Sequence, residues 1–101
     1  MTTVRAAALT DISPGQPTLV ELEGQRVALI RIGDTVYACG DICAHRGGYL
    51  SEGRLTGTRL ACPLHGWLYD VRTGQCVFPG RGASVPSFPV QVRDGDVFVE
   101  L

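Results

Sequence analysis

Hydrophobic residues occur along this chain in short runs separated by glycine, proline and aspartate. No stretch repeats them with the 3.6-residue period of an amphipathic helix. Valine, leucine, threonine and aromatic residues fill the runs, which is typical of β-strands. The pattern therefore predicts an all-β protein. The expected strands are residues 4–9, 17–23, 25–32, 35–39, 60–62, 67–71, 75–78, 90–93 and 97–101.

Turn residues predict how some of these strands pair. Gly33-Asp34 closes the strong apolar run 25–32 and joins it to its neighbour as a hairpin. Asp94-Gly95 accepts positive φ angles and predicts a closing hairpin, while Pro14-Gly15 marks a turn between the first two strands. A chain of 101 residues without repeat or linker is expected to form one domain, residues 1–101.

Two cysteine–histidine groups lie in predicted loops, at about residues 41–49 and 62–67. They read Cys43-Ala44-His45 and Cys62-Pro63-Leu64-His65, and they contain the only two histidines of the chain. Two thiolates and two imidazoles are the ligand set of a Rieske [2Fe–2S] centre, in which cysteines bind one iron and histidines the other. Nearby glycines allow backbone N–H groups to approach the sulfurs.

Zinc is the alternative metal, because it also binds two cysteines and two histidines. Familiar zinc fingers place two cysteines before two histidines, whereas each loop here mixes the two residue types. The spacing therefore favours iron–sulfur over zinc. Colour separates the two interpretations, since a Rieske protein is brown-red and a zinc protein is colourless.

The chain resembles the Rieske ferredoxins, small electron carriers of ring-hydroxylating oxygenase systems, over about its whole length. The resemblance implies stacked antiparallel sheets with a subdomain in which two loops hold the cluster at one tip. It also implies that Cys43, His45, Cys62 and His65 bind one [2Fe-2S] cluster per chain. The matching segments are Cys43–His45, Leu50–Gly53, Cys62–Gly66, Tyr69-Asp70, Thr73-Gly74, Pro86 and Phe88–Val90.

Three positions depart from the high-potential members of the wider Rieske superfamily. Those members carry a disulfide between the loops and a serine that bonds a cluster sulfide. Here the corresponding residues are Gly48, Leu64 and Trp67. With fewer donors to the sulfurs the reduced form is less stable, so the resemblance implies a low potential. Tyr69 matches an aromatic position whose hydroxyl can bond a ligand-cysteine sulfur.

The remaining candidates near the loops have simpler explanations. Cys39 and Cys76 are expected to be small buried side chains rather than ligands. A plant-type cluster is disfavoured because its Cys-x4-Cys-x2-Cys run is absent. Trp67 is expected to pack beneath the cluster, and residues 78–83 resemble the family's proline-rich loop that limits solvent there.

Charge and composition narrow the function classes. Nine arginines and ten acidic residues give a net charge of −1 without a basic block, so no nucleic-acid partner is expected. No signal-peptide core or membrane-length apolar run is present, so no membrane association is expected. The four cysteines are then expected to be reduced, which favours a cytoplasmic location.

The resemblance implies a soluble, monomeric electron carrier rather than an enzyme, with no catalytic residue of its own. It would pass single electrons from a flavin-dependent ferredoxin reductase to a terminal oxygenase. Oxygenase activity itself needs two further histidines and a carboxylate for a catalytic iron, and both histidines are already assigned. The alternative is a small Rieske subunit of a multisubunit reductase such as nitrite reductase. A redox sensor is disfavoured, because the sequence contains no recognisable effector or DNA-binding element.

Overall fold

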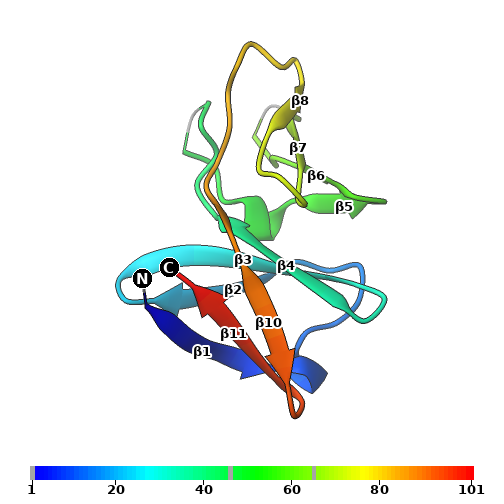
Figure 1. The fold of residues 1–101 in the computed structure, drawn as a ribbon. Helices are drawn as coiled ribbons and strands as arrows, with labels where there is room; N and C mark the ends of the chain where they lie inside the picture. Colours follow the sequence, from blue (N-terminus) through cyan, green and yellow to red (C-terminus); the bar gives the residue numbers. More distant parts are fainter. Residues whose placement is uncertain (1, 46, 65) are drawn as a thin grey trace.

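The computed structural model describes residues 2–45, 47–64 and 66–101. Within them the chain forms three antiparallel sheets, with strand orders β1-β11-β10, β2-β3-β4-β9 and β5-β6-β7-β8 (Figure 1). No α-helix occurs in these residues, and therefore none that could cross a membrane. The strands are β1 Thr3–Ala8, β2 Thr18–Leu22, β3 Gln25–Ile32, β4 Thr35–Gly40, β5 Arg54–Thr56, β6 Arg59–Ala61, β7 Leu68–Asp70, β8 Cys76–Phe78, β9 Ser87–Phe88, β10 Val90–Arg93 and β11 Asp96–Glu100.

The first two sheets form what we call the base lobe, residues 2–40 and 87–101. Side chains of a strand point alternately to its two faces, so every second residue can enter one core. Val27 and Leu29 of β3 meet Val97 and Val99 of β11 in this way, and all four are fully buried. The base lobe therefore has a continuous aliphatic core.

The third sheet and its connections form what we call the loop lobe, residues 41–86, which lies above the base lobe in Figure 1. Each of its strands has only three residues. Its core contains the fully buried Leu50, Leu60 and Tyr69. A 3₁₀ turn at Leu50–Glu52 leads from the first loop into this sheet.

The hairpin of β3 and β4 lies between the two lobes and contributes side chains to both cores. Val27 and Leu29 face the core of the base lobe, whereas Ala28 and Ile30 belong to the core of the loop lobe. Residues 27–30 are thus buried on both faces of the sheet, which explains their unbroken apolar run. The loop lobe is therefore built directly on the most buried strand of the base lobe.

The predicted all-β fold is confirmed, as are both predicted hairpins. Ile32 pairs with Thr35 across Gly33-Asp34, and Arg93 pairs with Asp96 across a turn whose two residues have positive φ. The first two strands do not form a hairpin, because β1 pairs with β11 while β2 pairs with β3. Strands β5 and β9 were not predicted.

Candidate metal centre

The first loop begins at Cys43, three residues after the last residue of β4. Its amide donates to the carbonyl oxygen of Gly48 at 2.8 Å, and the Gly47 amide donates to the Cys43 carbonyl oxygen at 3.1 Å. Gly47 has a φ of 71°, which glycine adopts without steric cost. These bonds close a tight hairpin tip between Ile42 and Tyr49, which form an isolated bridge.

The second loop begins at Cys62, after β6, and repeats this pattern at the same offsets. The Cys62 amide donates to the Trp67 carbonyl oxygen at 2.8 Å, and the Gly66 amide donates to the Cys62 carbonyl oxygen at 3.0 Å. Gly66 has a φ of 74°. The two cysteines therefore occupy equivalent positions in two similar hairpin tips, although their histidines follow at different distances along the chain.

The two loops touch at Gly48. An ideal Cβ added to Gly48 would lie 2.8 Å from Cys62 Sγ and 2.9 Å from Leu64 Cγ, so no larger residue fits without displacing the second loop. Cys43 and Cys62 are each only 3% exposed. Gly48 and Leu64, where the resemblance implies a disulfide in high-potential relatives, are thus neighbours across the two loops.

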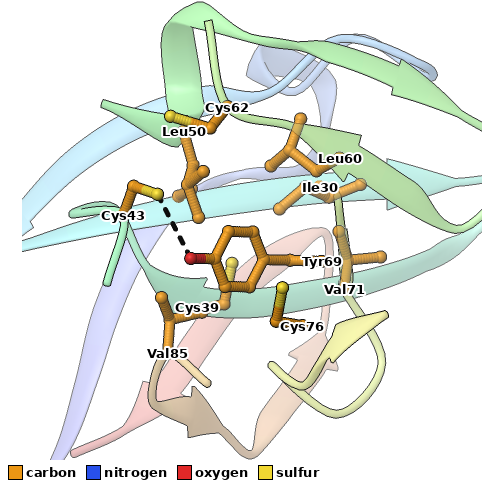
Figure 2. Close-up of a cluster of buried hydrophobic side chains, with 11 residues drawn as sticks. Ile30, Cys39, Cys43, Leu50, Leu60, Cys62, Tyr69, Val71, Cys76 and Val85 are labelled. Carbon is orange, nitrogen blue, oxygen red and sulfur yellow. Dashed lines mark hydrogen bonds between the residues drawn. The ribbon is translucent and has the colours of Figure 1, made fainter. Parts of the chain in front are cut away.

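Tyr69, a fully buried residue of β7, points its hydroxyl at Cys43 (Figure 2). The hydroxyl oxygen lies 3.1 Å from Cys43 Sγ and accepts the Ala44 amide at 3.1 Å. An amide can only donate, so the hydroxyl proton remains for the sulfur. Burial, followed by the contact with Cys43, raises the pKa of Tyr69, so the phenol keeps that proton. The His45 amide adds a longer bond to Cys43 Sγ at 3.4 Å.

His45 stands exposed on the first loop, with its ring stacked on Trp67 of the second loop. The ring centroids are 4.2 Å apart and the planes differ by 3°. Trp67 was expected to pack beneath the site; it is half-buried against the loop-lobe core and also contacts a predicted ligand directly. Its indole therefore fixes the plane of the imidazole. His65, the fourth predicted ligand, lies outside the described residues.

Asp41 anchors the first loop to the base lobe and was not found by sequence reasoning. It is the one charged side chain that is buried among the described residues. Its carboxylate accepts Arg26 Nε at 3.0 Å and the Ser51 amide at 2.6 Å. The Leu50 amide donates to its carbonyl oxygen at 2.7 Å, and the Arg26 guanidinium lies 3.8 Å from the centre of the Tyr49 ring. Both ends of the first loop are thereby held against β3.

Cys39 and Cys76 lie in the same buried cluster as Tyr69, as Figure 2 shows. Cys39 is fully buried on β4, and this burial, with a smaller effect of the Asp41 carboxylate, raises the pKa of its thiol to about 12. The Cys76 thiol, on β8, donates to the Phe78 carbonyl oxygen at 3.2 Å. Both residues are buried, as predicted, and they belong to the core beneath the loops.

The donors present fit a binuclear iron–sulfur cluster. In the part of the chain that the structure describes, no three histidine, cysteine or acidic side chains are grouped so that they could bind a single metal ion. A Rieske cluster requires only two protein ligands for each iron. Two buried cysteines from equivalent loops and the exposed imidazole of His45 supply three of these four donors, and the fourth predicted donor, His65, lies outside the described residues.

Comparisons with known proteins agree with this fit. The family model for the Rieske [2Fe-2S] domain matches residues 2–89. The ferredoxin component of the naphthalene 1,2-dioxygenase system of Pseudomonas putida is 32% identical, over 97% of this chain and 94% of that protein.

Solved structures give the same result. The ferredoxin of carbazole 1,9a-dioxygenase from Nocardioides aromaticivorans matches with a TM-score of 0.90 at 34% identity, over 98% of this chain and 97% of the other. A ferredoxin solved in complex with the oxygenase of carbazole 1,9a-dioxygenase matches with a TM-score of 0.88 at 34% identity. The match covers 96% of this chain and 100% of that ferredoxin. A putative nitrite reductase small subunit matches with a TM-score of 0.87 at 30% identity, over the full length of both chains.

Proposed function

This chain belongs to the Rieske [2Fe-2S] domain family and carries the cluster of that family, and we propose that Cys43, His45, Cys62 and His65 are its ligands. The protein is an electron carrier, and the relatives that it matches over nearly their full length include ferredoxin components of dioxygenase systems. We further propose that it works as a cytoplasmic monomer of one domain. In this role it takes single electrons from a flavin-dependent reductase and delivers them to a terminal oxygenase.

One contrast within the site carries this proposal. Cys43 and Cys62 are buried, each only 3% exposed, while His45 is exposed in the loop lobe. When bound, the cluster supplies one-electron redox chemistry. The buried cysteines would hold the cluster on the protein side, and the exposed imidazole of His45 would connect it to the surface that a partner can reach. Trp67 keeps that imidazole in one orientation through the stacked contact.

Residues around Cys43 Sγ also influence the reduction potential of the cluster. The Tyr69 hydroxyl and the His45 amide stabilise negative charge on Cys43 Sγ, which favours the reduced form. Trp67 cannot supply the second hydroxyl of the high-potential relatives, and Gly48 and Leu64 form no crosslink. We expect a midpoint near the bottom of the Rieske range, about −150 mV. Voltammetry of the purified protein tests this, and a clearly positive midpoint would contradict it.

A carrier of this kind binds two partners in turn through one surface. A ferredoxin solved in complex with its oxygenase supports such docking for a protein of this fold. Alone, this protein should turn over no organic substrate. With a reductase and a terminal oxygenase it should support hydroxylation, and the two partners should compete for it through small, short-lived contacts. A stable ternary complex, or turnover by this chain alone, would refute the shuttle.

The second candidate is a fixed Rieske subunit of a larger reductase. The full-length match to a putative nitrite reductase small subunit favours it. Affinity purification from the native cell separates the two functions. A stoichiometric large subunit that stays bound through size exclusion would support the fixed subunit, and a monomeric brown-red fraction would support the shuttle.

A further inference from the structure

The two lobes carry opposite charge, which the net value of −1 conceals. Residues 41–86, the loop lobe, contain five arginines and three acidic residues. The rest of the chain, which includes the base lobe, contains four arginines and seven acidic residues. The lobe that contains the predicted ligands is thus the positive one.

Ion pairs sharpen this difference in the loop lobe. The Asp41 carboxylate pairs with Arg26 of the base lobe at 3.0 Å, and Asp70 pairs with Arg72 at 2.8 Å. Glu52 is then the one acidic residue of the loop lobe outside the ion pairs of the described residues. Against it stand three exposed arginines that make no ion pair there: Arg54, Arg59 and Arg81.

In the base lobe, the ion pairs of the described residues leave mainly acidic side chains outside them. Arg5 pairs with Asp96 at 2.8 Å, and Arg31 pairs with Asp34 at 3.4 Å. Arg93 is the remaining arginine of this lobe. The acidic residues outside these pairs are Asp11, Glu21, Glu23, Asp94 and Glu100.

These charges lie far enough apart to act separately. The longest dimension of the molecule is 38 Å, and Figure 1 shows the lobes stacked one above the other. Charges are screened over roughly 8 Å at physiological ionic strength, so a partner near one lobe responds mainly to that lobe. In the loop lobe, Leu64 is 54% exposed and Phe78 is 61% exposed. These side chains can make apolar contacts with a partner once it is close.

We propose that the loop lobe docks on acidic protein surfaces, and that aspartate and glutamate side chains surround the electron-exchange site of each redox partner. Opposite charge raises the rate of productive encounter and orients the carrier, whereas the acidic base lobe is turned away. This inference rests on the proposed function as an electron carrier, and it specifies the chemistry of the partner. Net charge alone would predict the reverse preference.

The test uses the cluster-loaded protein and two gold electrodes as probes. One electrode carries a carboxylate-terminated monolayer and the other an amine-terminated monolayer, both at low ionic strength. We expect electron transfer to be at least about tenfold faster at the carboxylate surface, and the difference to vanish near 1 M salt. The double variant Arg54→Gln/Arg59→Gln should lose most of this preference. Arg93→Gln, a matched change in the base lobe, should keep it.

Equal rates at the two surfaces, or faster transfer at the amine surface, would overturn the inference and leave the carrier function intact. Preference retained in the loop-lobe double variant and lost in Arg93→Gln would overturn it as well. Visible absorption and the electron paramagnetic resonance (EPR) signal of the reduced protein establish cluster content before each run. A protein that takes up no cluster would refute the proposed function, and the docking inference with it.

Discussion

The base lobe and the loop lobe are stabilised by different means. In the base lobe, strands of up to eight residues bury alternating aliphatic side chains around Leu29 and Val99. In the loop lobe, strands of three residues are joined by loops with their own backbone hydrogen bonds. Its core includes Tyr69 and the two predicted cysteine ligands. The base lobe therefore has the more regular sheets, and the loop lobe depends more on individual polar contacts.

This difference shows how a small protein separates stability from redox chemistry. The β3–β4 hairpin contributes to both cores, so a rigid sheet supports the two loops directly. The predicted ligands can then lie on tight loops, where glycine allows close approach, without weakening the base lobe. The cluster itself contributes to folding, because a metal site bound only in the native state stabilises that state.

The largest effect on the protein should come from removing a predicted ligand, which should destabilise the loop lobe and leave the base lobe folded. We expect His45→Ala or His65→Ala to abolish cluster binding, because one iron then keeps a single protein ligand. Iron content and visible absorption measure the loss. Hydrogen exchange should show weakened protection in residues 41–86 while Val27 and Leu29 stay protected.

Cys39→Ser and Cys76→Ser are the matched controls for this prediction. Both side chains lie in the core beneath the loops, and neither is a predicted ligand. Their iron content and spectrum should stay nearly intact. Loss of the cluster in both serine variants, with retention in both histidine variants, would reverse the assignment.

Two matched core truncations should sharpen the comparison. Leu29 of the base lobe and Leu60 of the loop lobe are both fully buried. Each change to alanine should lower the free energy of unfolding by about 2–5 kcal/mol. Leu60→Ala should also speed release of iron to a chelator, whereas Leu29→Ala should leave that rate almost unchanged. Equal release rates in the two variants would argue against separable lobes.

The Asp41 anchor should give a smaller effect at the junction of the lobes. Asp41→Asn breaks the buried ion pair with Arg26 while its amide oxygen can still accept the Ser51 amide. We expect a loss of about 2–3 kcal/mol, as for hydrogen bonds to a charged group, and faster iron release, since the first loop is held less firmly. Asp96→Asn, which breaks an exposed pair with Arg5, should cost about 0–1 kcal/mol. Similar losses in both variants, measured by urea unfolding, would contradict the anchoring role.

Tyr69→Phe should give the smallest effect, seen mainly in the redox chemistry of the loop lobe, although it also removes the acceptor of the Ala44 amide. It removes the hydroxyl donor to Cys43 Sγ and keeps the buried ring. Loss of about 1 kcal/mol of preference for the reduced form corresponds to a potential about 40 mV lower. Tyr49→Phe, at a tyrosine 40% exposed, should leave the potential unchanged in the same voltammetric series. An unchanged potential in Tyr69→Phe would show that this hydroxyl does not tune the cluster.

The sequence predicted those parts of the fold that local chemistry determines. Gly33-Asp34 and Asp94-Gly95 specify their hairpins because the turn residues themselves accept the required backbone angles. Strand β9 could not be found in this way, since its two residues pair with β4 only through Phe88 with Ala38 and Ser87 with Cys39. Such a short strand exists only in its tertiary context.

In the site, too, some features follow from the local sequence and others only from the tertiary structure. The spacing of Cys43, His45 and Cys62 marks two loops from the sequence alone. The stacking of His45 on Trp67 and the pairing of Asp41 with Arg26 depend on how segments far apart in the chain converge. One signal was available for the second contact: a lone acidic residue, Asp41, stands two residues before Cys43. The ligand role of all four residues, and a single domain over residues 1–101, remain predictions.

Pulsed EPR of the reduced protein tests the central claim most directly. If Cys43 and Cys62 bind one iron and His45 and His65 the other, the rhombic signal should carry strong couplings to two histidine nitrogens. Labelling the histidines with ¹⁵N should change both couplings, and should leave weaker backbone couplings as they are. A signal without histidine couplings, or a colourless protein that contains zinc, would contradict the account.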